Sequence, residues 1–350
     1  MVETTAMHIS LSHKTLHFKK PARTSRGEYI THDSIVITIR DDKGQKIGLG
    51  ECAPLPDLSC DRDSYTRMSD VAKLINEALD SASYNDYLRP YPALLFALES
   101  ALYDYQQNPI LYDTPFARSE VGIPTNGLIW MSDYDQMLAQ AKKKILAGHR
   151  CIKFKIGAIK WEDEMCLLDK IRSRFTKDTL EIRVDANGGL GLDMDIVKDK
   201  LQELARYDIH SIEQPIPQYH WNEMAELCRQ DILPIALDEE LIGVNDTEQK
   251  KLMLDTIKPH YIVLKPTLHG GITGTLEWIS EAQKRGISSW ITSALESNIG
   301  LRNVALLAAR AYGPNITFAQ GLGTGQLFTD NIEMDIEMRG AKLWRCKVED

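Results

Sequence analysis

Charged residues stand at the ends of five short apolar segments, at a nearly constant interval along the chain. Subtracting their residue numbers gives steps of 30, 28, 25 and 27 residues. Each segment reads as a strand buried on both faces, and such a strand does not carry a charge without a partner or a metal. Strands repeated at this interval are typical of a (β/α)8 barrel, whose strand ends converge on one active-site face. The five residues are Lys155, Asp185, Glu213, Asp238 and Lys265.

The chain of 350 residues is longer than one ordinary domain, so a barrel with a second module is expected. Residues 1–120 read as strands followed by helices, which predicts an α+β capping domain. Residues 121–325 alternate strand and helix and predict the α/β barrel, while residues 326–350 are expected to return to the capping domain. The eight predicted strands are 123–130, 151–157, 180–187, 210–215, 233–240, 261–266, 288–296 and 317–323.

The composition of the chain indicates which kinds of binding partner and which cellular compartment to expect. The net charge is −9 without a basic stripe, which argues against nucleic acid; the run Lys142–Lys144 is predicted to be the solvated face of a helix. No apolar run is long enough to cross a membrane, and the alternating N-terminus reads as a strand rather than a signal peptide. Six scattered cysteines without a CxxC pair predict free thiols and a cytoplasmic location. The sequence leaves the oligomeric state open.

The three carboxylates predict a metal site. Asp185, Glu213 and Asp238 end neighbouring strands, which lie about 4.8 Å apart in a sheet. Three hard oxygen ligands with open positions suit Mg²⁺, with Mn²⁺ as an alternative. Any one of these carboxylates alone could simply cap a helix or form a surface ion pair. Three carboxylates in register favour the metal site.

The lysines predict proton transfer. Lys153 and Lys155 are two residues apart on one strand, so both point to the same face. A neighbouring like charge and a cation both disfavour a protonated amine. Lys155 is therefore the expected general base and Lys153 its tuner, unless one or both only pair with Asp185. Lys265 faces them from the sixth strand and is either a second base or a purely electrostatic group.

Three further residues are predicted to support the site. Asn187 shares a face with Asp185 and is a candidate for the metal shell or for a catalytic lysine. Arg183 lies deeper on that face, where it either helps to tune Lys155 or forms a salt bridge inside the barrel. Glu239 follows Asp238 and points the other way, so we expect it behind the ligands.

At these residues the chain resembles the enolase superfamily, in its muconate-lactonizing-enzyme-like subgroup. The pattern of that subgroup is K-x-K on the second strand, then Asp, Glu and Asp, then Lys. Here it corresponds to Lys153-Phe154-Lys155, to the three carboxylates and to Lys265. The resemblance implies a modified barrel with a capping domain and a lysine base that works with Mg²⁺.

Several stretches further resemble the o-succinylbenzoate synthase family of menaquinone biosynthesis. They are TSRGEY (24–29), GLGECAPLPDLS (48–59), LKPTLHGGITGTLEWI (264–279), TSALESNIGL (292–301) and GLGTGQLF (321–328). The resemblance implies syn dehydration of a small carboxylate substrate, 2-succinyl-6-hydroxy-2,4-cyclohexadiene-1-carboxylate, with Lys155 as base and then acid. Substrate contacts are expected from Ser25, Arg26, Leu55, Ser293, Glu296, Gly321 and Gly323.

Other functions fit the same five charges. Dipeptide epimerases and N-acylamino acid racemases share them and would use Lys155 and Lys265 as paired bases. Those epimerases usually carry an acidic pair at the eighth strand, which GLGTGQ lacks. A Schiff-base aldolase would use Lys265 without a metal, and a non-catalytic binding barrel would leave the buried charges without a purpose.

Overall fold

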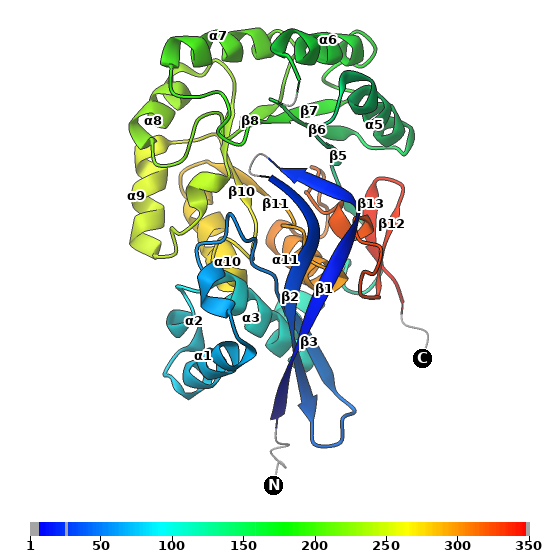
Figure 1. Cartoon of the computed structure of the whole chain (residues 1–350), viewed down its shortest axis with the longest axis vertical. Helices are drawn as coiled ribbons and strands as arrows, with labels where there is room; N and C mark the ends of the chain where they lie inside the picture. Colours follow the sequence, from blue (N-terminus) through cyan, green and yellow to red (C-terminus); the bar gives the residue numbers. More distant parts are fainter. Residues whose placement is uncertain (1–6, 25–26, 158, 348–350) are drawn as a thin grey trace.

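In the computed structural model, residues 7–24, 27–157 and 159–347 are described, and they form three sheets (Figure 1). An antiparallel N-terminal sheet lies beside a parallel seven-stranded sheet ringed by helices, and a small antiparallel sheet contains the last two strands. The predicted architecture of a barrel with an N-terminal α+β unit is confirmed.

The N-terminal unit is a three-stranded sheet covered by helices. Its strands are β1 (Met7–Thr24), β2 (Gly27–Asp41) and β3 (Ile47–Cys52). Its helices are the 3-10 helix η1 (Arg62–Tyr65), α1 (Met68–Asp80), α2 (Tyr84–Tyr87), α3 (Pro92–Gln106) and α4 (Pro109–Tyr112). The long hairpin of β1 and β2 extends beyond α3 toward the barrel strands (Figure 1). This hairpin brings an N-terminal segment to the barrel.

Seven parallel strands form the barrel sheet, in the order β11-β10-β9-β8-β7-β6-β5. They are β5 (Gly127–Ile129), β6 (Cys151–Lys155), β7 (Glu181–Asp185), β8 (Ser211–Glu213), β9 (Ile235–Leu237), β10 (Tyr261–Leu264) and β11 (Ser288–Ile291). The connecting helices are α5 (Tyr134–Leu146), α6 (Trp161–Arg172), α7 (Met194–Ala205), α8 (Trp221–Gln230), η2 (Glu239–Leu241), α9 (Thr247–Ile257), α10 (Gly271–Gln283) and α11 (Asn298–Tyr312).

The eighth predicted strand, 317–323, is reduced to two isolated bridges. Gln320 bridges Thr125 and Gly321 bridges Thr292, both in parallel, so these two residues join the edges of the seven-stranded sheet. Glycines at 321 and 323 flank a single leucine, and glycine is a poor strand residue because it offers no side chain to pack. The barrel is therefore closed over a much shorter length than the sequence predicts.

The last segment of the chain contacts both units. After the 3-10 helix η3 (Thr324–Gln326), strand β12 (Ile336–Arg339) pairs with β13 (Lys342–Arg345). Strand β13 in turn pairs with β4 (Ile123–Pro124), which precedes the barrel. Residues next to η3 reach the N-terminal hairpin, where the amide of Lys19 donates to the Leu327 carbonyl at 2.8 Å. This contact agrees with the predicted return of residues 326–350, whose domain limits remain a prediction.

Strand side chains divide into two layers because alternate residues face opposite sides. Outward-facing Phe154, Val184 and Ile212 are buried in the main core beneath the helices. Inside the barrel a separate small cluster contains Ala236, Val263 and Trp290. This inner layer fills the barrel below the level of the charged strand ends, so that the charges are confined to one mouth.

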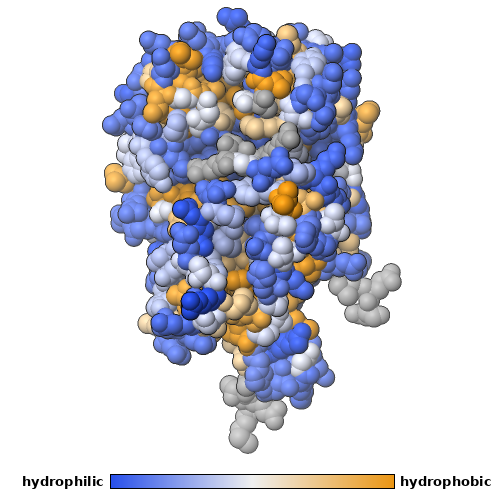
Figure 2. Space-filling model, in the orientation of Figure 1, coloured by the Kyte–Doolittle hydropathy of each residue, from blue (hydrophilic) through white to orange (hydrophobic). Residues whose placement is uncertain are grey.

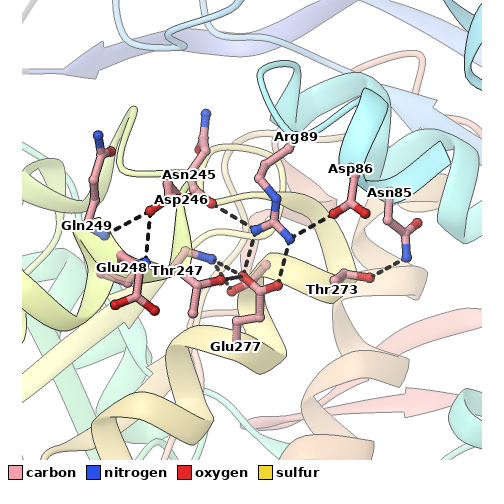
Figure 3. A network of polar contacts seen from close by, with 12 residues as sticks. Asn85, Asp86, Arg89, Asn245, Asp246, Thr247, Glu248, Gln249, Thr273 and Glu277 are labelled. Atoms are coloured by element: carbon pink, nitrogen blue, oxygen red, sulfur yellow. Dashed lines mark hydrogen bonds and ion pairs between the residues drawn. The ribbon is translucent and has the colours of Figure 1, made fainter. Parts of the chain in front are cut away.

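The two units are joined by a polar network around Glu277 of α10 (Figure 3). Arg89, which follows α2, donates to both carboxylate oxygens of Glu277, at 2.9 and 3.0 Å, and to the Asn245 carbonyl at 3.0 Å. Buried Lys250 of α9 donates to the same carboxylate at 2.8 Å. The network fixes the N-terminal helices against the barrel.

The face shown in Figure 2 is mainly hydrophilic, with its hydrophobic residues in small, separated patches. Among the residues that the structure describes, no helix is both long and apolar enough to span a membrane.

Candidate active site at the barrel mouth

Five neighbouring strands present the predicted charges at one mouth of the barrel. Lys155, Asp185 and Glu213 are the last residues of β6, β7 and β8. Asp238 and Lys265 follow directly after β9 and β10. The register pairs Lys155 with Asp185 and Asp185 with Glu213, so these charges lie at one level. The structure thus brings together all five residues that the spacing predicted.

Lysine ammonium groups contact each of the three carboxylates. Lys153 Nζ lies 2.9 Å from Asp185 Oδ2 and 2.5 Å from Glu213 Oε2. Lys155 Nζ lies 3.3 Å from the same Asp185 oxygen. Lys265 donates to both oxygens of Asp238, at 2.6 Å to Oδ1. Each of these three carboxylates therefore has a lysine partner, a condition that buried carboxylates require.

These contacts set the protonation of the buried groups. Burial lowers the pKa of Lys153, but Asp185 and Glu213 outweigh burial and raise it overall. Burial likewise opposes the charge of Lys265, but Asp238 raises its pKa above the ordinary value. Burial raises the pKa of Asp185, but Lys153 and Lys155 attract its anion and lower the pKa overall. Lys153 and Lys265 are therefore cations, and Asp185 is an anion, at neutral pH.

Among the described residues at this mouth, two carboxylate oxygens are buried without a hydrogen-bond partner: Glu213 Oε1 and Glu239 Oε2. Burial, followed by the charge of Asp238, raises the pKa of Glu239 to about 7. Burial also raises the pKa of Glu213, with smaller contributions from the charges of Asp185 and Asp238, although Lys153 acts in the opposite direction. An unsatisfied buried carboxylate calls for a cation or a proton.

The donor set fits a divalent cation, although the described side chains are not arranged around one. No group of three or more His, Cys, Asp or Glu residues in the described ranges has metal-binding geometry. Instead, each predicted ligand turns an oxygen toward a lysine. Three carboxylates from adjacent strands, one with an unsatisfied oxygen, provide the oxygen ligands that Mg²⁺ or Mn²⁺ prefers.

A cavity of about 620 Å³ opens over these charges. Ten of the residues predicted for the site line it: Lys153, Lys155, Asp185, Asn187, Glu239, Lys265, Leu55, Ser293, Gly321 and Gly323. Asn187 links two of them, because its Oδ1 accepts from Lys155 at 2.8 Å while its Nδ2 donates to Glu239 at 2.8 Å. Asn187 has a left-handed φ of 45°, which asparagine tolerates better than most residues. Asn187 thus connects the proposed base to the carboxylates.

Glu239 lines the cavity rather than standing behind the ligands. The strand alternation behind that prediction ends at Leu237, because η2 begins at Glu239 and Asp238 has a non-strand backbone (φ −126°, ψ −82°). The break turns the side chain of Glu239 toward Asn187.

Two predicted residues lie elsewhere. Glu296 is fully buried outside the cavity lining, where it accepts hydrogen bonds from Thr267 and from the Ala294 amide. It stabilises the turn after β11, so the predicted substrate contact is wrong for it. Arg183 donates to Glu181 at 2.7 Å and stacks over the Trp290 ring at 4.2 Å. Of the two roles predicted for Arg183, these contacts support the salt bridge inside the barrel and not the tuning of Lys155.

Ser25 and Arg26 lie outside the described residues. The neighbouring Tyr29 of β2 and Leu58 do line the cavity, together with Leu55. Tyr29 donates to Asp57 at 2.9 Å, which connects the hairpin to the loop after β3. Tyr29 and Leu58 were missed as contacts, although they lie close in sequence to the predicted contacts Arg26 and Leu55.

Further residues that line the cavity are uncharged, so the pattern of charged strand ends did not predict them. Trp130, Asn126 and Thr292 line the space between β5 and β11. Leu55, Ala294 and Leu295 belong to an apolar cluster that Tyr29, Leu58 and Trp130 flank. The cavity therefore combines a charged floor with a largely apolar roof, which suits a ligand with an anionic head and an apolar body.

Three comparisons with known proteins agree with this geometry. Residues 136–339 match the family model described as enolase C-terminal domain-like. The chain is 40% identical to an o-succinylbenzoate synthase of Desulfotalea psychrophila, over 96% of this chain and 98% of the relative. It is 25% identical to an L-Ala-D/L-amino acid epimerase of a Maribacter species, over 86% and 87%. The crystal structure of MenC from Desulfotalea psychrophila superposes with a TM-score of 0.80 at 37% identity, covering 97% of this chain and 99% of that one.

Proposed function

The chain belongs to the enolase superfamily, and on this premise we propose that it acts as an o-succinylbenzoate synthase. The reaction is the dehydration of 2-succinyl-6-hydroxy-2,4-cyclohexadiene-1-carboxylate to o-succinylbenzoate, in menaquinone biosynthesis. The observation that carries the proposal is one cavity in which lysines of β6 and β10 face each other across carboxylates. That arrangement suits removal of a proton next to a carboxylate.

Lys155 is the proposed base and acid. Its amine takes the proton from the carbon next to the ring carboxylate, and the electron pair moves into an enediolate. The same ammonium then returns the proton to the departing hydroxyl, so that water leaves from the same face. Asn187 accepts a hydrogen bond from Lys155 at 2.8 Å and holds the nitrogen in place.

Lys153 and Lys265 are proposed to remain cations. The Nζ atoms of Lys153 and Lys155 both contact Asp185 Oδ2, so Lys153 is a positive charge next to the base. Lys265 is held by Asp238, and its raised pKa favours an ammonium that stabilises negative charge on the substrate. An ion-paired ammonium is not the neutral amine that a Schiff base requires.

Members of this superfamily generally use a divalent metal, and we propose Mg²⁺, with Mn²⁺ as an alternative. Asp185, Glu213 and Asp238 would hold it. When bound, the cation supplies positive charge against the developing enediolate. The lysines that now balance these carboxylates would then turn toward the substrate.

The decisive experiment follows aromatisation in the ultraviolet, with purified protein, the cyclohexadiene substrate and MgCl₂. Turnover should fall by a factor of about 10²–10⁴ in Lys155→Ala, the usual contribution of a general base. Lys142→Ala, an exposed lysine of α5, is the matched control and should keep wild-type turnover. A Lys155→Ala protein with near-normal kcat would remove Lys155 from the role of base.

A second candidate is epimerisation of a dipeptide or an N-acylamino acid. It is favoured by the position of Lys265, which lines the same cavity as Lys155 from the opposite side of the carboxylates. Turnover of L-Ala-D/L-Glu or N-succinylamino acids in D₂O, with no turnover of the cyclohexadiene, would establish this function instead. Both lysines would then have to exchange their protons with solvent.

A further inference from the structure

The cavity has a second arm that lies outside the barrel. Besides the charged strand ends, its lining includes Gln140, Lys143 and Lys144 of α5, and Ala147 and His149 in the turn that follows. Lys144 packs on the outer face of β5, because a Cβ atom added at Gly127 would lie 2.8 Å from the Cβ of Lys144. One continuous cavity thus touches both the inside and the outside of the barrel wall.

A gap between β5 and the segment that replaces the eighth strand accounts for this arm. The amide of Asn126 donates to the Gln320 carbonyl at 2.9 Å. Beyond this bond, no backbone hydrogen bond joins residues 127–130 to residues 321–327 in the described part of the chain. Instead, the Trp130 amide donates a hydrogen bond to Gln140 Oε1 at 2.9 Å, and Gln140 Nε2 donates one to the Trp130 carbonyl at 3.2 Å. Since regular parallel strands bond at even spacing, the wall is open here.

The outer arm is positively charged. Neither Lys143 nor Lys144 pairs with a carboxylate among the described residues, and burial lowers the pKa of Lys144, as does the charge of Lys143 to a smaller extent. The carboxylates that line the cavity, Asp185 and Glu239, lie at its inner end. In a chain of net charge −9, two unpaired lysines along one cavity create a local attraction for anions.

We propose that this arm is a side entrance that binds a small carboxylate and guides it through the barrel wall, with Lys143 and Lys144 as the attracting charges. The inference rests on the proposed function, in which substrate and product each carry two carboxylates. A ligand that enters here avoids the part of the roof formed by Tyr29, Leu55 and Leu58. Access therefore does not require the β1–β2 hairpin or the loop after β3 to move.

The charge test measures the association rate of o-succinylbenzoate by stopped-flow tryptophan fluorescence, in MgCl₂, since Trp130 lines the cavity. Lys144→Gln should lower the rate at low ionic strength by about 3- to 10-fold, at the lower end of electrostatic steering effects. The difference should shrink at high salt. Lys142→Gln removes the same charge from the same helix outside the cavity, and should stay within about twofold of wild type.

The steric test places tryptophan at the turn. Ala147→Trp should obstruct the arm and lower both the association rate and kcat/KM, while Leu146→Trp, at a neighbouring position 88% exposed and outside the lining, should change neither. If Ala147→Trp and Lys144→Gln both associate as fast as wild type, the entrance is wrong. Wild-type protein that does not bind o-succinylbenzoate also overturns it. If the protein binds o-succinylbenzoate but does not turn over the cyclohexadiene substrate, only the proposed reaction is refuted. The entrance is still tested, because its test measures association rates.

Discussion

Three lysines contact three buried carboxylates at the barrel mouth, and of these lysines Lys153 is itself buried. Removing one partner from a buried pair leaves an uncompensated charge, which costs about 3–5 kcal/mol. Lys153→Met should therefore lower the free energy of unfolding by about that amount without metal, as measured by urea titration. Lys142→Met, at an exposed position, is the control. An unchanged stability for Lys153→Met would mean that Asp185 and Glu213 are satisfied in another way.

A divalent cation should stabilise the folded chain through the same carboxylates. At a concentration 100 times its dissociation constant, a ligand that binds only the folded state adds about 2.7 kcal/mol. MgCl₂ should therefore raise the Tm of wild-type protein, EDTA should reverse the increase, and Asp185→Asn should abolish it. A Tm that does not respond to Mg²⁺ or Mn²⁺ would argue against the proposed ligands.

At the scale of single residues, the sequence predicts the charged residues at the strand ends well and the residues of the surrounding loops poorly. Lys155 and Asp185 are predictable because a charge that ends a buried apolar strand requires a partner or a metal. Glu296 is the opposite case: a carboxyl in a loop near the mouth is equally able to bind substrate or to brace its own turn. Its bonds to Thr267 and to the Ala294 amide depend on the folded loop, which the sequence does not display.

Among the elements, α3 and β3 approach unusually closely. A Cβ atom at Gly50 would lie 1.8 Å from the Ala97 carbonyl oxygen, so no side chain fits between the helix and the strand. Gly50→Ala should lower the free energy of unfolding by about 1–3 kcal/mol or more, the usual cost of overpacking. Ile47→Ala, at the exposed start of β3, should change it by only about 0.5 kcal/mol. Equal effects in urea titration would contradict the close approach.

The strands that the sequence locates most reliably are short apolar segments followed by a charge, such as β9 and β10. The region 317–323 fails as a strand because its glycines weaken pairing, and its pairing partners lie at opposite ends of the barrel sequence. The lysines of α5 were predicted to be a solvated helix face. Lys142 and Lys143 are exposed, as predicted, but Lys143 and the half-buried Lys144 also line the cavity, which follows from the gap beside β5 and not from the period of the helix.

Over the whole molecule, Glu277 connects the two units and should make their stability depend on pH. Burial alone would raise its pKa, but hydrogen bonds from Arg89 and Lys250 outweigh burial and lower the pKa to about 2, from an ordinary 4.5. A depressed pKa in the folded state stabilises the protein above pH 4.5, and this contribution is lost as the pH falls toward 2. The loss should be visible as acid-sensitive unfolding.

The matched variant is Glu277→Gln, which keeps the shape and removes the charge. At pH 7 it should be less stable than wild type by about 1.5–3 kcal/mol, the value of hydrogen bonds to charged groups. At pH 3 the two proteins should differ less, as judged by urea unfolding at both pH values. A difference that is independent of pH would show that the charge of Glu277 contributes nothing.

Tyr29 of the β1–β2 hairpin and Leu55 and Leu58 of the loop after β3 supply part of the roof of the cavity, while β6 to β10 and the residues that follow them supply its floor. This part of the roof lies in a stretch of the chain that carries none of the lysines and carboxylates of the site. A new substrate preference can arise from changes within roughly the first sixty residues while the lysines and carboxylates stay untouched. Grafting that stretch from a relative of different selectivity is a modular route to new activity, in which inherited chemistry is redirected rather than rebuilt.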